Sequence, residues 1–146
     1  MSTYALELTE NQLQAISKAC EICARLKSGQ ILSAISLLEL NDIHGKPVDT
    51  YELGKSVEPI FKLAMGLEPN AAWGIGYSDK IDTLYDIHEV IRHRLAWDDA
   101  YDKGIIVEGE PRKWPEMMTV DFDEPMKCGL EPLPKLVRNN NAPQDD

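Results

Sequence analysis

The chain of 146 residues is long enough for one domain, and 43% of its residues are apolar, which suffices for a core. Twenty-five Asp and Glu stand against fifteen Lys and Arg, so the formal net charge is −10. This charge argues against a general nucleic-acid binder and against docking on anionic membranes. Because the sequence lacks a signal-peptide pattern and an apolar run of about 20 residues, we expect a cytoplasmic protein.

Four helices are predicted from the apolar spacing and the capping residues. Residues 4–8 alternate weakly, as in a short strand, and Thr9 and Gln12 then form a capping box for a helix over residues 10–27. A second helix is expected over residues 31–40 and a third over residues 50–65, with Gly66 at its end. The longest helix is expected over residues 79–102.

The C-terminal third has a different pattern, because five prolines argue against helices there. Residues 105–107, 117–122 and 126–130 read as short strands. The sequence therefore predicts an α+β fold, in which a helical core of about four helices carries a small antiparallel sheet from the C-terminal third. We expect residues 1–137 to form a single globular domain and the polar residues 138–146 to be a disordered tail.

The three cysteines, Cys20, Cys23 and Cys128, do not suggest a disulfide framework or a metal site. Cys20 and Cys23 have C-x-x-C spacing, but they lie within a strong helical pattern, where we expect small core side chains. His88 and His93 are five residues apart, so their rings lie about 140° apart around a helix and cannot share a zinc ion. No cofactor or metal is expected, and the absence of a nucleotide-binding fingerprint or a nucleophile elbow argues against an enzyme.

The longest predicted helix carries cations at the border of its apolar side. That side is formed by Ile81, Leu84, His88, Ile91 and Leu95, and the opposite side, with Asp82, Asp86, Glu89 and His93, is expected to face water. Arg92 lies near Tyr85 and His88, and Arg94 lies on the other flank. Arg92 either reaches into a pocket, where it grips an anionic ligand, or extends its head to water or to an acid of another helix.

Two stretches resemble a family of small, mostly uncharacterised proteins encoded by bacteriophages and prophages. The first stretch is residues 18–30, which hold the first helix and its exit. The second begins with Ala72-Trp73-Gly74-Ile75 and continues with Tyr85-Asp86-Ile87 and Val90-Ile91-Arg92-His93. The resemblance implies a phage origin and no enzymatic activity. Small acidic phage proteins of this kind act in host takeover or defence evasion, by masking a host protein or by sequestering a signalling nucleotide in the host cytoplasm.

These considerations predict a non-catalytic protein that binds an anionic, nucleotide-like signalling molecule. In such a site the arginines would pair with phosphates and the aromatic rings would stack on bases. The remaining groups would form hydrogen bonds with the polar edges of the bases. The candidate ligand-binding residues are Arg25, Gln30, Trp73, Gly74, Tyr85, His88, Arg92 and Arg94.

An alternative is an acidic protein–protein inhibitor that mimics a nucleic acid and blocks a basic surface of a host defence protein. Residues 97–146 hold twelve acids against six basic residues, and this function would depend on Asp98, Asp99, Asp121, Asp123 and Glu124. In either case Trp73, Ile75 and Tyr77 offer more apolar surface than a small monomer hides, so we expect a homodimer or a higher homo-oligomer.

Overall fold

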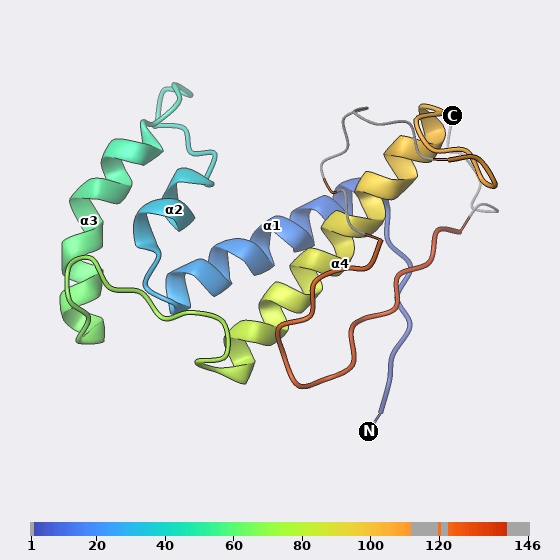
Figure 1. The fold of residues 1–146 in the computed structure, drawn as a ribbon. Helices are drawn as coiled ribbons and strands as arrows, with labels where there is room; N and C mark the ends of the chain where they lie inside the picture. Colours follow the sequence, from blue (N-terminus) through green and yellow to red (C-terminus); the bar gives the residue numbers. More distant parts are fainter. Residues whose placement is uncertain (1, 112–119, 121–122, 140–146) are drawn as a thin grey trace.

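The computed structural model describes residues 2–111, 120 and 123–139, and in this part the fold is built from four helices (Figure 1). They are α1 (Glu10–Lys27), α2 (Ile31–Ser36), α3 (Thr50–Met65) and α4 (Asp79–Asp102). The predicted helices over residues 10–27, 50–65 and 79–102 are confirmed. The second helix ends four residues earlier than the expected residue 40.

The predicted α+β fold is wrong, because the described residues contain no β-strand and only one isolated bridge, between Asn41 and Pro47. Residues 4–8 and 126–130 are irregular, and residues 105–107 lie between two glycines with positive φ, Gly104 and Gly109. The expected strand over residues 117–122 lies outside the described residues except for Val120. The backbone N–H groups of residues 128–130 donate to side chains of α4 and not to a neighbouring strand.

Helix α1 packs along α4, and together they form the centre of the molecule (Figure 1). The capping box of α1 forms as predicted, since the Thr9 side chain accepts from the Gln12 backbone and the Gln12 side chain accepts from the Thr9 N–H. After α1 the chain reverses at Gly29, whose φ of 83° favours glycine. Ser28 and Ala24, at this end of α1, are buried.

Helices α2 and α3 form a helical hairpin at one end of the molecule, with α2 also contacting α1 (Figure 1). The two helices approach closely at Gly54, because a Cβ atom there would lie 3.2 Å from the Leu32 Cα. Lys62 is buried and donates to the Pro69 carbonyl at 2.6 Å while it pairs with Glu58 at 3.3 Å. The other side of α3 leaves Ile60 and Leu63 exposed.

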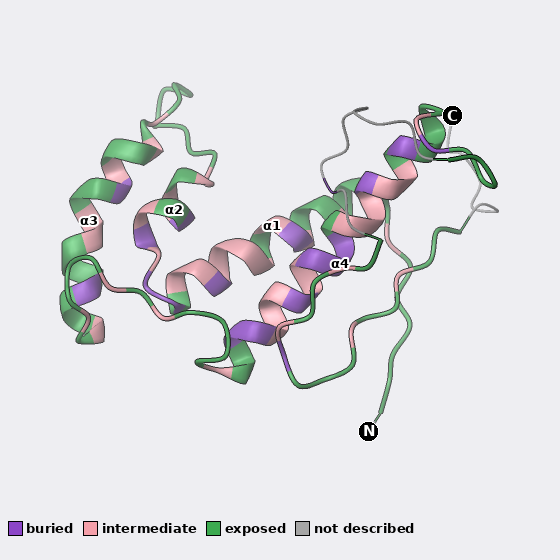
Figure 2. Ribbon diagram, in the orientation of Figure 1, coloured by how far each residue is buried: buried purple, intermediate pink, exposed green. Residues whose placement is uncertain are grey.

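The acidic side of α4 does not face water, contrary to the sequence-based expectation. Asp82 and Asp86 are each only 3% exposed, and Glu89 is also buried. Buried stretches recur along α4 (Figure 2). One cover is the loop before α4, where the Gly76 N–H donates to both carboxylate oxygens of Asp82. The other is the segment that we call the C-terminal strap, residues 123–139, which runs beside α4 (Figure 1). Asp86 accepts the N–H groups of Cys128 at 2.5 Å and Gly129 at 3.0 Å. A carboxylate that accepts backbone N–H groups can be buried at low cost.

The strap lies close to α4 because residue 129 is a glycine. A Cβ atom at Gly129 would lie 2.9 Å from the Asp86 carboxylate and 3.3 Å from the Thr83 backbone nitrogen. Asp79 holds the next residue of the strap by accepting the Leu130 N–H at 3.0 Å. Near the end of the strap, Arg138 pairs with both carboxylate oxygens of Asp102.

The predicted division into a globular domain of residues 1–137 and a disordered tail of residues 138–146 stays a prediction, and residues 140–146 lie outside the described part. None of the helices described above is long and apolar enough to cross a membrane.

Candidate functional site

The exit of α1 holds two of the predicted ligand-binding residues next to each other. The Arg25 guanidinium donates through Nη1 to the Gln30 side-chain oxygen at 2.8 Å and through Nε to Glu21 at 2.9 Å. Its Nη2 atom also lies 2.8 Å from the same Glu21 oxygen. The charge of Arg25 is therefore balanced within the chain.

His88 links this group to α4 across the helix interface. Its Nδ1 atom lies 2.9 Å from the Ser17 hydroxyl, and its Nε2 atom lies 3.8 Å from Glu21 and 3.9 Å from Glu89. Arg92 pairs with Glu89, an acid of its own helix, at 3.2 Å. Arg25, Glu21, His88, Glu89 and Arg92 thus form a continuous row of polar side chains from α1 to α4.

The Trp-Gly-Ile loop lies beside the exit of α1, because the Trp73 N–H donates to the Ser28 carbonyl at 2.7 Å. The Trp73 ring stacks on Tyr77, with centroids 4.3 Å apart and planes inclined by 4°. Gly74 is exposed and Tyr85 is half-buried. The loop therefore lies beside Ser28, between Arg25 and Gln30 in the chain, and His88 approaches Arg25 through Glu21.

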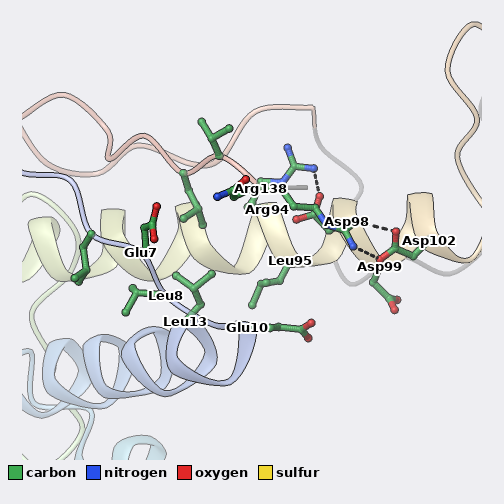
Figure 3. A pocket seen from close by; sticks show the side chains of 14 residues that line it. Glu7, Leu8, Glu10, Leu13, Arg94, Leu95, Asp98, Asp99, Asp102 and Arg138 are labelled. Atoms are coloured by element: carbon green, nitrogen blue, oxygen red, sulfur yellow. Dashed lines mark hydrogen bonds and ion pairs between the residues drawn. The ribbon is translucent and has the colours of Figure 1, made fainter. Parts of the chain in front are cut away.

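Arg94 lies apart from this group, in a cavity of about 360 Å³ that we call the acidic pocket (Figure 3). Four parts of the chain form it: the N-terminal segment, the start of α1, the last turns of α4, and the end of the strap. Its acidic side chains are Glu7, Glu10, Asp98, Asp99 and Asp102.

The two arginines of the acidic pocket are both paired with its own acids. Arg94 pairs with Asp98, and Arg138 donates to the two oxygens of Asp102 at 2.8 and 2.9 Å (Figure 3). This pairing holds the pKa of the Asp102 carboxyl below its usual value. Glu7, Glu10 and Asp99 add three more carboxylates, of which Asp99 pairs with Lys103 at 2.7 Å, so the pocket keeps a negative balance.

Leucine side chains supply the apolar part of the pocket. Leu8, Leu13 and Leu95 are half-buried, whereas Leu6 lies exposed on the N-terminal segment. Of the pocket, sequence reasoning named Arg94 for a nucleotide site and Asp98 and Asp99 for an acidic surface. It missed Glu7, Glu10, Asp102 and Arg138, because no local pattern shows that both ends of the chain meet at the last turns of α4.

The cysteines have no disulfide partner, and each is half-buried. Burial, and then the neighbouring Cys23, raises the pKa of the Cys20 thiol. Burial also raises the pKa of Cys128, with further contributions from Asp86, Asp82 and Glu89. Over the described ranges, no three His, Cys, Asp or Glu side chains gather in a way that would hold a metal ion.

Comparisons with protein-family models, curated proteins and solved structures found no match for this chain.

Proposed function

We propose that the chain is a non-catalytic binding protein that uses the acidic pocket and its surroundings to mask a basic surface of a partner protein. The observation that carries the proposal is the charge balance of the pocket, where five carboxylates surround two arginines that already have acidic partners. A basic surface finds an excess of negative charge there, next to exposed apolar groups.

The resemblance to phage-encoded proteins supplies the setting for this proposal. In that setting the partner is a host defence protein in the bacterial cytoplasm, and the acidic surface replaces the nucleic acid that the partner normally binds. Asp98, Asp99 and Asp102 follow one another along the end of α4, and Asp123 and Glu124 are exposed at the start of the strap. Asp121, part of the predicted acidic surface, lies outside the described residues.

A test uses bacterial strains that each carry one cloned defence system and that block a susceptible phage. Expression of the wild-type chain is expected to restore plaque formation in at least one strain. The double variant Glu7→Lys, Asp99→Lys reverses two exposed charges of the pocket and is expected to abolish this effect. Glu39→Lys with Glu52→Lys makes the same charge change on the helical hairpin, where both side chains are exposed, and should keep the activity.

Two outcomes contradict the proposal: equal restoration by all three chains, or no restoration by the wild type in any strain. Loss of activity in the pocket variant alone, with unchanged circular dichroism, supports it.

Sequestration of a nucleotide-like molecule is the second candidate function, favoured by the stacked Trp73 and Tyr77 rings beside Arg25 and Gln30. It has less support, because Arg25 and Arg92 each have a carboxylate partner within the chain. Calorimetric titration of nucleotides into the wild type, Trp73→Ala and Arg92→Ala separates the two functions. Binding that both substitutions weaken favours the nucleotide.

A further inference from the structure

The acidic pocket combines three chemical features that together describe a ligand more narrowly than a basic surface. They are carboxylates beyond those paired with arginine, an apolar lining, and one buried N–H group. The inference drawn from them rests on the proposed function.

The first feature is negative charge at the mouth of the pocket. Asp99 is more than half exposed, and its ion pair with Lys103 is a solvent-exposed one between neighbouring turns of α4. Such a pair contributes little and is readily exchanged for another cation. Glu7 is exposed on the N-terminal segment, at the other end of the pocket from Asp99 in Figure 3. A ligand with a positive charge at each end can therefore pair with Glu7 at one end and with Asp99 at the other.

The second feature is the aliphatic lining between these charges. Leu8, Leu95 and Leu136 are half-buried, and Leu6 and Val137 are 76% and 84% exposed. A cavity of about 360 Å³ lies at the small end of ligand pockets. It therefore has room for a few aliphatic side chains but not for a folded helix.

The third feature is the Arg94 guanidinium. One of its Nη atoms meets Asp98, but its Nε atom is buried and has no hydrogen-bond partner within the described part of the chain. A buried N–H group without an acceptor is costly. The Arg94 side chain as a whole is 34% exposed, so a turn of its guanidinium toward the cavity would present this N–H group to a carbonyl oxygen of a ligand and remove that cost.

We infer that the acidic pocket binds a short basic peptide segment of the partner protein. An aliphatic side chain of the segment enters the leucine-lined cavity, and flanking Lys or Arg side chains pair with Glu7 and Asp99. The Arg94 guanidinium turns toward the cavity, and a backbone carbonyl of the segment then accepts from its Nε atom. A polyamine would satisfy the charges, but it has neither a branched aliphatic group nor a carbonyl oxygen. The combination of all three features therefore selects a peptide.

The test measures fluorescence anisotropy of a labelled peptide in which two leucines are flanked by two lysines on each side. Replacing its leucines with serines should weaken binding at least tenfold, and replacing its lysines with glutamates should abolish it. Spermidine at equal charge concentration should displace it poorly. Equal binding of the leucine and serine peptides, or full displacement by spermidine, would overturn the inference in favour of simple charge attraction.

Variants of the protein locate the site. Glu7→Gln with Asp99→Asn should weaken binding about tenfold, and Leu6→Ser with Val137→Ser by a similar factor. Arg94→Lys keeps the charge beside Asp98 but removes Nε, so binding should fall about threefold to tenfold. The matched controls lie on the helical hairpin: Glu39→Gln with Glu52→Gln, and Ile60→Ser with Leu63→Ser. They should stay within twofold of the wild type, and equal losses in the controls would overturn the inference.

Different results would overturn this inference and the proposed function. If the peptide does not bind but charge reversal at the pocket abolishes phage rescue, the partner is recognised as a folded surface and the inference is wrong. If the peptide binds as described but charge reversal leaves phage rescue unchanged, the pocket is correct and the proposed function is wrong.

Discussion

The C-terminal strap and the helical hairpin bury polar side chains of opposite charge. Under the strap, the buried Asp86 accepts the N–H groups of Cys128 and Gly129, and the exposed Asp79 accepts that of Leu130. In the hairpin Lys62 is buried and donates to the Pro69 carbonyl, while Ile60 and Leu63 of α3 lie exposed. Satisfied hydrogen bonds, and not low polarity, therefore decide which of these side chains are covered.

The largest expected effect is on the strap, from Asp86→Ala. This change leaves the N–H groups of Cys128 and Gly129 without their acceptor, and a hydrogen bond to a charged group contributes about 1.5–3 kcal/mol. We expect the free energy of unfolding to fall by about 2–4 kcal/mol in urea titrations followed by circular dichroism. Asp99→Ala is the control, because its exposed pair with Lys103 contributes less than about 1 kcal/mol. Equal losses in the two variants would contradict this role of Asp86.

A smaller effect is expected from Gly129→Ala, which adds a Cβ atom 2.9 Å from the Asp86 carboxylate and 3.3 Å from the Thr83 backbone. The backbone cannot move as easily as a flexible side chain, so we expect a loss of about 1–3 kcal/mol. Gly74→Ala is the matched control, since no atom lies within 4 Å of its Cβ position. Unfolding by urea should separate the two variants, and identical midpoints would show that the strap does not lie this close to α4.

Substitutions on the hairpin should change self-association of the protein and not its free energy of unfolding. Ile60→Ser with Leu63→Ser should change the free energy of unfolding by less than about 0.5 kcal/mol per site, because both side chains are exposed. We expect the wild type to self-associate through exposed apolar residues, among them Ile75 and Tyr77 of the loop before α4. Sedimentation of the wild type, this variant and Ile75→Ser with Tyr77→Ser shows which surface is used. A wild type that stays a 16.4 kDa species at micromolar concentration would refute self-association.

The smallest effect concerns the thiol of Cys128 on the strap. Burial and the nearby acids raise its pKa, so less thiolate is present at a given pH. We expect iodoacetamide to modify Cys128 in the folded protein more slowly at pH 8 than in the urea-unfolded chain. The pH profile of its rate should also be displaced upward. Mass spectrometry of the modified peptide follows both quantities, and coincident profiles would count against the acidic surroundings of Cys128.

Much of the helical part could be predicted from the sequence, because its signals are local. Thr9 and Gln12 start α1, Asp49 accepts the Glu52 N–H at the start of α3, and Gly66 ends α3 in the left-handed conformation. These residues act within one turn of the helix that they begin or end.

The strap and the acidic pocket could not be predicted, because they depend on residues far apart in the chain. The helical pattern alone predicts that Asp86 faces solvent. Only the structure shows that Cys128 and Gly129 lie beside it and donate to its carboxylate. The same distant contact explains the false strand over residues 126–130, whose backbone groups donate to carboxylates. The pocket joins Glu7 to Asp99, and no spacing in the sequence relates them.

The central claim is that carboxylates of α4 hold the strap in place, so that its end can form a wall of the acidic pocket. Amide hydrogen exchange at Cys128 and Gly129, measured by nuclear magnetic resonance, tests it most directly. The two amides should exchange at least about 100-fold more slowly than in the unfolded chain, and Asp86→Ala should remove this protection while the amides of α1 stay protected. Exchange of both amides at the unfolded rate in the wild type would contradict the claim.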